Sequence, residues 1–120
     1  MQMKKVYYLS TCSTCSRILK KLNLSSDFIL QDIKKEKITP SQLDEMKNFS
    51  ISYEALFSRR SQKYKQMGLA GKELTEEDYR NLILEEYTFL KRPVFIIDNQ
   101  IYIGNSAKNI EAVEYALIKY

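Results

Sequence analysis

The chain has 120 residues, of which 44% are hydrophobic and 28% are charged, and this balance is ordinary for one globular domain spanning residues 1–120. Its 19 basic and 15 acidic side chains give a net charge of +4, which suits an anionic small substrate or an acidic protein partner and is too weak to indicate nucleic-acid binding. The chain contains no histidine, so Ser-His-Asp and Cys-His catalysis are both excluded.

The first third of the chain predicts a strand, a helix and a second strand. Residues 4–9 form an apolar run typical of a strand, and residues 14–24 carry apolar side chains at helical spacing. Residues 27–32 contain an apolar triplet and predict the second strand, after which residues 32–37 are charged and turn away. This order predicts a parallel pair of strands joined by a right-handed crossover. The apolar face of the helix consists of Ile18, Leu19 and Leu22.

The middle of the chain, about residues 39–90, predicts several helices. Thr39-Pro40 is a helix start, because a capping residue precedes a proline at the first helical position. Leu43 and Met46 give this helix an apolar side.

Further along the same segment, residues 53–57 continue the helical character, and Gly68 and Gly71 bracket a turn. Residues 75–78 open another helix with three acidic side chains in its first turn, where the helix dipole favours negative charge. Its buried face is predicted to consist of Tyr79, Leu82 and Ile83.

The hydrophobic period changes after Arg92-Pro93. Residues 94–97 predict a strand, residues 98–100 a hairpin turn and residues 101–104 the return strand. The resulting order is β-α-β, a helical insert over about residues 33–91, and then β-β-α. The final helix is predicted to be capped by Ser106 and to bury Ile110, Val113 and Leu117.

The only two cysteines of the chain form the motif Cys12-Ser13-Thr14-Cys15, between the first predicted strand and the first predicted helix. A Cys-x-x-Cys at such a junction is typical of a thiol redox site. The free N–H groups and dipole of the helix stabilise a thiolate on Cys12, and the thiolate is the nucleophilic form. Cys15, about one helical turn further on, can attack a mixed disulfide formed on Cys12.

The cysteine pair has three other interpretations: a zinc site, a structural disulfide or two inert thiols. A closed zinc site requires about four nitrogen or sulfur ligands, and two cysteines without histidine do not supply them, so we expect no metal. A structural disulfide across so short a loop would constrain little of the unfolded chain. Two inert, buried cysteines remain an alternative, because free cysteine is often a small buried hydrophobe.

Several segments of the chain form a set of motifs in a fixed order and spacing. They are Cys12-Ser13-Thr14-Cys15-Ser16-Arg17; Ser58-Arg59-Arg60-Ser61 followed by Tyr64 and Met67-Gly68-Leu69; Leu74-Thr75-Glu76-Glu77; Leu90-Lys91-Arg92-Pro93-Val94; and Ile103-Gly104. This set resembles the motifs of the ArsC/Spx family, which includes glutaredoxin-linked arsenate reductases and Spx transcription regulators. The resemblance implies an α/β, thioredoxin-like fold with a mixed four-stranded sheet, and a cis proline at Pro93 packed beside the Cys12 loop.

The resemblance also implies roles for individual residues. Cys12 matches the nucleophile, and Arg92 matches an arginine that lies by the nucleophile and binds an oxyanion or holds a thiolate. Arg60 matches the arginine of the insert, with Arg59 as a one-residue alternative. Two interpretations without a functional role remain. In the first, Arg59 and Arg60 form a solvated basic face, and in the second, Arg92 is a surface charge beside a turn. The residues expected to bind substrate are Arg59, Arg60, Thr14 and Pro93.

Two positions depart from the family pattern. Arsenate reductases of this type carry an arginine directly after the glycine of the last hairpin, whereas Gly104 is followed here by Asn105. The departure removes a bidentate, charge-assisted contact from the expected anion site. The glycine associated with polymerase contact in Spx proteins aligns with Ser52.

The residues and the resemblance together predict a thiol-dependent oxidoreductase of the arsenate reductase-like type. Its substrate would be a small oxyanion or a disulfide, and its reductant glutathione, glutaredoxin or thioredoxin, with no bound cofactor. The first alternative is an Spx-like redox-sensing regulator that uses a Cys12–Cys15 disulfide as a switch. The second is a protein that binds glutathione or a partner protein without turnover.

The sequence also suggests where the protein is found. No apolar run approaches the length of a membrane span, and residues 1–5 do not resemble the start of a signal peptide. We therefore expect a cytoplasmic monomer without membrane contact.

Overall fold

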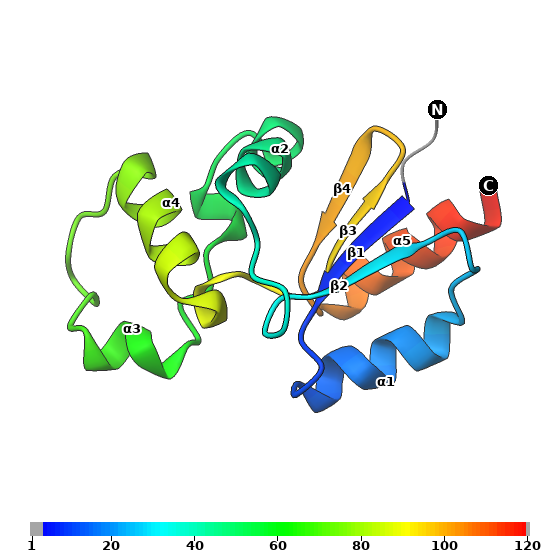
Figure 1. Cartoon of the computed structure of the whole chain (residues 1–120), viewed down its shortest axis with the longest axis horizontal. Helices are drawn as coiled ribbons and strands as arrows, with labels where there is room; N and C mark the ends of the chain where they lie inside the picture. The colour runs from blue at the N-terminus through cyan, green and yellow to red at the C-terminus, as the bar shows by residue number, and fades with distance from the viewer. Residues whose placement is uncertain (1–3, 120) are drawn as a thin grey trace. The chain divides into compact units, whose positions relative to one another are not determined.

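The computed structural model describes residues 4–119, which divide into two compact units. One unit comprises the chain as far as Lys37 together with the chain from Arg92 onward, and the other is Ile38–Lys91 (Figure 1). We call them the sheet unit and the helical unit and describe each by itself.

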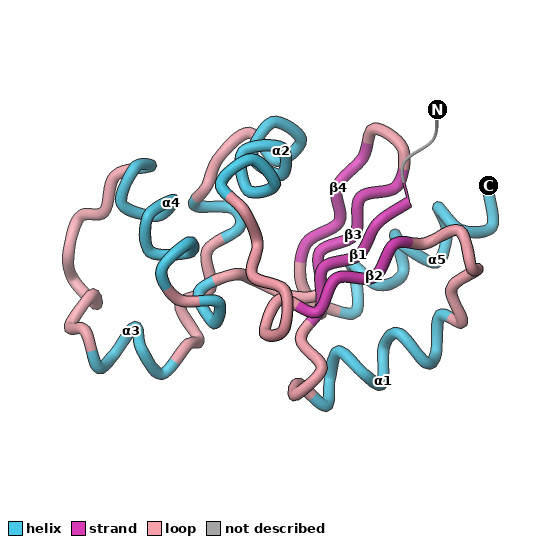
Figure 2. The backbone as a smooth tube through the Cα atoms, viewed as in Figure 1, coloured by secondary structure: helices cyan, strands magenta, loops and turns pink. Residues whose placement is uncertain are grey.

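The sheet unit contains one mixed sheet of four strands in the order β2-β1-β3-β4 (Figure 2). β1 runs parallel to β2, whereas β3 is antiparallel to both β1 and β4. The parallel pair and the α/β class expected from the sequence are therefore confirmed. The elements of this unit are β1 (Lys4–Tyr8), α1 (Ser13–Leu22), β2 (Ile29–Asp32), β3 (Val94–Ile97), β4 (Gln100–Ile103) and α5 (Ala107–Lys119).

Helices α1 and α5 contribute to one hydrophobic core with the sheet. Val6 of β1 pairs with Phe95 of β3, and both side chains are fully buried in this core. Alternate residues of a strand point to opposite faces, so these two side chains mark the face that the helices cover. The helices supply Ile18 from α1 and Ile110, Val113 and Ala116 from α5, and Phe28 and Ile97 complete the buried cluster.

The ends of the predicted elements in this unit have local causes. α1 stops at Leu22 because Asn23 adopts a left-handed conformation with φ 48°, a common way to end a helix. The hairpin between β3 and β4 turns at Asp98, which also has a positive φ of 56°. Ser106 caps α5 as predicted: its Oγ accepts a hydrogen bond from the Asn109 N–H at 3.1 Å.

The helical unit contains three α-helices and two short 3₁₀ helices. Thr39 caps the first of these helices as predicted, and Thr75 caps the helix expected to open over residues 75–78, each through a reciprocal pair of hydrogen bonds. The elements are α2 (Pro40–Ser50), η1 (Glu54–Leu56), α3 (Gln62–Gln66), α4 (Glu76–Glu85) and η2 (Tyr87–Phe89).

Two details of the sequence prediction are corrected in this unit. Residues 53–57 do not continue a long helix: only one 3₁₀ turn forms, and Phe57 becomes extended and makes an antiparallel bridge with Leu90. Leu82 is half-buried, whereas Tyr79 and Ile83 on the same helix are buried. The aromatic ring of Phe57 explains the first correction, because it packs at 4.9 Å from the ring of Tyr79 and 5.0 Å from that of Phe89.

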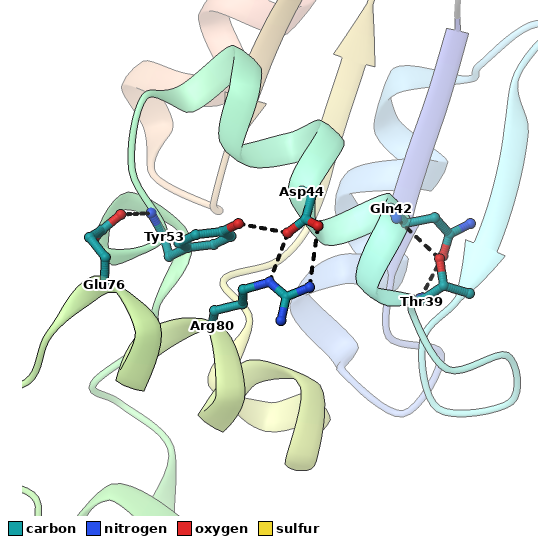
Figure 3. A network of polar contacts seen from close by, with 6 residues as sticks. All are labelled: Thr39, Gln42, Asp44, Tyr53, Glu76 and Arg80. Carbon is teal, nitrogen blue, oxygen red and sulfur yellow. Dashed lines mark hydrogen bonds and ion pairs between the residues drawn. The ribbon is translucent and has the colours of Figure 1, made fainter.

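A polar network joins α2, η1 and α4 (Figure 3). The Arg80 guanidinium donates to both carboxylate oxygens of Asp44, at 2.8 and 3.2 Å, and the Tyr53 hydroxyl donates to the same carboxylate at 2.6 Å. Glu76 accepts from the backbone amides of Tyr53 and Glu54, at 2.7 and 3.1 Å. The network fixes the short helix η1 between its two longer neighbours.

Within residues 4–119, none of the helices has the length and apolar character needed to cross a membrane.

Candidate functional site

Cys12 lies at the N-terminus of α1, in the loop that follows β1. Its backbone is extended, with φ −93° and ψ 112°, as is usual for the residue that caps a helix. The Cys12 N–H donates to the Leu9 carbonyl at 3.0 Å, and the Cys12 carbonyl accepts from the Ser16 N–H at 3.1 Å. A tight turn on one side and the helix on the other therefore hold the residue.

The thiol of Cys12 is free and partly exposed. Burial raises its pKa, but this effect is outweighed by hydrogen bonding to Cys15, by the positive charge of Arg92 and by the backbone amide of Thr14, so the pKa is lowered overall. The Cys12 side chain makes no capping hydrogen bond, yet the amides at the helix N-terminus still favour its thiolate. Cys12 is therefore the thiol of the pair that ionises more readily.

Cys15 is chemically the opposite of Cys12. Its side chain is fully buried, and burial together with the neighbouring Cys12 raises its pKa to about 11, although a backbone hydrogen bond with Leu9 and the charge of Arg92 act in the other direction. At neutral pH Cys15 is therefore a protonated thiol beside a sulfur that ionises more readily.

Arg92 and Pro93 directly precede β3. The peptide bond between them is cis, as the family resemblance implied. Arg92 is half-buried, and its positive charge lowers the pKa of both cysteines, which means that its guanidinium lies near them. Pro93 is buried, and its carbonyl accepts from the Gly104 N–H at 2.9 Å. Cys12, Thr14, Cys15, Arg92 and Pro93 thus belong to one structural unit.

Arg59 and Arg60 belong to the helical unit and differ in their contacts. The Arg59 guanidinium donates to Glu54 Oε2 at 3.0 Å and to the Tyr79 hydroxyl at 2.9 Å. The exposed guanidinium of Arg60 makes no hydrogen bond or ion pair with any residue between 4 and 119. Arg59 is therefore engaged within its own unit, and Arg60 is the arginine available to a ligand.

The sequence analysis did not identify Asp32 as a neighbour of the Cys12 loop. Asp32 ends β2, only 9% of its surface is exposed, and its carboxylate accepts a hydrogen bond from the Ser10 N–H at 3.3 Å. An acidic residue in the last position of a predicted strand was the available signal, because a carboxylate that becomes buried there requires hydrogen-bond donors.

Asn105, which stands where arsenate reductases of this type have an arginine, is exposed. Gly104 has φ 95°, a conformation that favours glycine, and its carbonyl accepts from Asn109 Nδ2 at 2.8 Å. In the part of the chain from 4 to 119, no three His, Cys, Asp or Glu side chains gather as metal ligands would.

The architecture defines the class of protein. A mixed sheet in the order β2-β1-β3-β4, a cysteine at the N-terminus of the first helix and a cis proline before the third strand together constitute a thioredoxin-like fold. The chain belongs to the ArsC family, whose sequence model matches residues 7–113.

Solved structures of similar proteins agree with this assignment of fold. The arsenate reductase of Vibrio cholerae is 17% identical, with a TM-score of 0.71 over 96% of this chain and 98% of that one. A protein from Streptococcus mutans, described as a "possible arsenate reductase", is 25% identical, with a TM-score of 0.67 over 92% and 99%. An arsenate reductase (ArsC) related protein from Brucella melitensis is 21% identical, with a TM-score of 0.67 over 92% of each chain. No curated protein sequence matches the chain significantly.

Proposed function

We propose that the protein is a thiol-dependent oxidoreductase in which Cys12 attacks a small oxyanion or a disulfide. The observation that carries this proposal is the asymmetry of the cysteine pair. The pKa of Cys12 is lowered and that of Cys15 is raised to about 11, although the two residues lie only three positions apart at the start of α1. A readily ionised thiol beside a buried one suits a nucleophile and a resolving thiol.

With a disulfide substrate R–S–S–R′, the Cys12 thiolate attacks one sulfur, forms a mixed disulfide with R and releases R′S⁻. Cys15 then loses its proton, attacks the Cys12 sulfur and displaces RS⁻. The substrate gains two electrons, and the cysteine pair is oxidised to a disulfide. Once Cys12 is in the mixed disulfide it carries no charge, so one of the causes that raise the pKa of Cys15 is removed exactly when Cys15 must ionise.

With arsenate, Cys12 displaces one oxygen of the oxyanion as water and forms a sulfur–arsenic(V) bond. A second thiol, either Cys15 or an external one, attacks the Cys12 sulfur, and the electron pair of the broken bond stays on arsenic. Arsenite, in which arsenic has the oxidation state +3, then leaves. Two thiols are oxidised to one disulfide, which supplies the two electrons.

The charges around the thiol support an anionic substrate. Arg92 would stabilise both the Cys12 thiolate and a bound oxyanion, because a guanidinium forms two parallel hydrogen bonds with such groups. Thr14 and Pro93 would line the site, and Arg60, whose guanidinium makes no hydrogen bond or ion pair with residues 4–119, stays a predicted substrate-binding residue of the helical unit. Asn105 in place of an arginine argues for slow reduction of arsenate and for a disulfide as the better substrate.

The oxidised cysteine pair must be reduced again in every cycle. We propose glutathione, glutaredoxin or thioredoxin as the reductant, with the protein acting as a cytoplasmic monomer that needs no bound cofactor. An anionic thiol such as glutathione is compatible with the net charge of +4.

A coupled assay tests the proposal. The consumption of reduced glutathione is followed with arsenate, with a glutathione mixed disulfide and with a protein disulfide, each in the presence of glutaredoxin. We expect turnover of at least one substrate, and loss of this turnover in Cys12→Ser. Rates equal to those of the Cys12→Ser variant for all three substrates would contradict the proposal.

The position of the two cysteines in one helical turn also favours a second candidate, a redox-sensing regulator that is switched by the Cys12–Cys15 disulfide. Such a protein would form the disulfide under peroxide without catalytic turnover. The coupled assay therefore separates the two candidates, because the regulator would consume at most two glutathione molecules per protein, which is what reduction of one disulfide requires.

A further inference from the structure

We propose that Asp32 is a positioning residue for Cys12, because its carboxylate holds the loop that presents the thiol. The inference rests on the proposed function in one respect, since it takes Cys12 as the nucleophile. Asp32 is not expected to contact substrate and would act only through the backbone of the Cys12 loop.

Asp32 lies where the pairing of β1 and β2 ends. The last pair of the ladder is Tyr8 with Asp32, and the Tyr8 carbonyl still accepts from the Ile33 N–H at 2.9 Å. Beyond this pair, the Ser10 N–H donates to Asp32 Oδ1 at 3.3 Å. The carboxylate thus continues the connection between the two strands after the backbone ladder has stopped.

The backbone carbonyl of Asp32 has other partners. It accepts from the amides of Lys35 and Glu36, at 3.1 and 2.8 Å, and so closes the turn after β2. Asp32 Oδ1 also accepts from the Lys34 N–H at 3.2 Å. One oxygen of the side chain therefore joins the loop after β2 to the loop before Cys12.

The surroundings of the carboxylate favour its charged form. Burial raises the pKa of Asp32, but the hydrogen bonds from Ser10 and Lys34 and the charge of Lys35 outweigh this effect and lower it. Asp32 is therefore ionised at neutral pH, and an ionised carboxylate is a stronger hydrogen-bond acceptor than a protonated one. Its second oxygen, Oδ2, is buried and has no hydrogen-bond partner among residues 4–119.

The contact with Ser10 bears directly on Cys12. Ser10 lies within the turn that the Cys12 N–H closes on the Leu9 carbonyl, and Cys12 then begins α1. The sulfur gains its low pKa in part from the amides of Thr14 and Cys15, so that pKa depends on where the turn places Cys12 relative to the helix. Releasing Ser10 would loosen the turn and weaken those contacts.

Two substitutions separate positioning from charge. Asp32→Ala removes the acceptor, and we expect the rate of Cys12 alkylation by iodoacetamide at pH 6 to fall by about three-fold or more, because alkylation follows the thiolate fraction. Asp32→Asn removes the charge and keeps an oxygen acceptor. Its amide group would occupy the place of Oδ2, which has no hydrogen-bond partner to lose, so we expect Asp32→Asn to retain a rate close to that of the wild type.

Val113→Ala is the matched control for stability. Val113 is fully buried in the core of the same unit, and its truncation lowers stability without removing any hydrogen bond of the Cys12 loop. We expect its Cys12 alkylation rate to equal that of the wild type. If Asp32→Ala does not fold, Asp32→Leu keeps a side chain of similar shape without an acceptor and is expected to react as slowly.

The outcomes distinguish this inference from the proposed function. A folded Asp32→Ala or Asp32→Leu variant in which Cys12 is alkylated at the wild-type rate would show that Asp32 only closes the turn after β2. An Asp32→Asn variant that reacts as slowly as Asp32→Ala would show that the charge of Asp32 matters and that its acceptor oxygen does not. Either result overturns the positioning role and leaves the proposed function standing. Wild-type Cys12 that reacts no faster than glutathione would overturn the proposed function, and the role of Asp32 with it.

Discussion

Cys12 and Cys15 lie one helical turn apart, yet their environments move their pKa values in opposite directions. Cys12 caps α1 and is partly exposed, whereas Cys15 lies inside the first turn and is fully buried. The amides of the helix N-terminus favour the thiolate of Cys12, and burial favours the thiol of Cys15. The order of reaction of the two sulfurs follows from this difference.

Alkylation should therefore be selective for Cys12. At pH 6 to 7, iodoacetamide is expected to label Cys12 at least about ten-fold faster than Cys15, because only the thiolate reacts. Peptide mass spectrometry of the labelled protein measures both rates. Cys15→Ser should leave the labelling of Cys12 fast, and faster labelling of Cys15 than of Cys12 would contradict the assignment.

Arg92 is expected to set both the reactivity of Cys12 and the affinity for anions. A fixed positive charge near a thiol favours its thiolate, so Arg92→Ala should slow alkylation at pH 6 by about three-fold or more. Arg92→Lys should retain part of this effect but lose much of the anion affinity, because lysine lacks the planar fork. The measurements are thiolate absorbance against pH and a sulfate or arsenate titration.

Lys20→Ala is the control for Arg92, since it removes an exposed cation from the same unit, two turns along α1. Lys20→Ala should change neither the pKa of Cys12 nor the affinity for anions. If Arg92→Ala leaves both the pKa of Cys12 and the anion affinity unaltered, Arg92 is a surface charge.

Arsenate reduction by the wild type is expected to be slow, and Asn105→Arg should increase it. A hydrogen bond to a charged group contributes about 1.5–3 kcal/mol, which corresponds to about ten-fold or more in kcat/KM. The coupled assay with arsenate and glutaredoxin compares the two proteins, and Asn105→Gln controls for side-chain length. An Asn105→Arg variant no more active than Asn105→Gln would contradict the explanation.

The network around Asp44 predicts how stability depends on pH. Hydrogen bonds from Arg80 and then Tyr53 lower the pKa of Asp44 from 3.8 to about 2. A carboxylate with a lowered folded-state pKa contributes its stability above the unfolded-state value and loses it as the pH falls through the folded-state value. We therefore expect the thermal midpoint to fall between about pH 4 and pH 2 more steeply in the wild type than in Asp44→Asn.

Circular dichroism at several pH values measures this slope. Asp27→Asn, which removes an exposed carboxylate from the sheet unit, is the control and should retain the wild-type slope. The side chains of Asp44 and Arg80 are partly exposed, so added salt should reduce the difference between wild type and Asp44→Asn. Parallel slopes for wild type and Asp44→Asn would contradict the role of the network.

The sequence alone predicted most of the fold, because local signals and hydrophobic periods agreed with the final structure. The predicted caps at Thr39 and Ser106 form their side-chain hydrogen bonds, and the helix expected to open over residues 75–78 begins with a cap at Thr75. The extension of helical character through residues 53–57 was wrong, since it depended on the distant packing of Phe57 against Phe89. Contacts between residues far apart in sequence have no local pattern.

In the candidate site too, a local motif identifies some residues and only the structure identifies the others. Cys12 and Cys15 stand out as a motif, and their roles stay predictions that the geometry supports. The difference between Arg59 and Arg60 required the structure, because only the structure shows Arg59 bonded to Glu54 and Tyr79. Asp32 was missed because its contact with Ser10 joins the end of β2 to the turn after β1 and spans 22 positions of the chain.

The central claim is that Cys12 is the nucleophile and Cys15 resolves its adduct, and trapping that adduct tests it most directly. Wild type and Cys15→Ser are incubated with glutathione disulfide, and their peptides are analysed by mass spectrometry without reduction. We predict one glutathione on Cys12 of Cys15→Ser, and an intramolecular Cys12–Cys15 disulfide without glutathione in the wild type. Glutathione attached to Cys15 in the wild type, or no adduct on Cys12 in Cys15→Ser, would contradict the account.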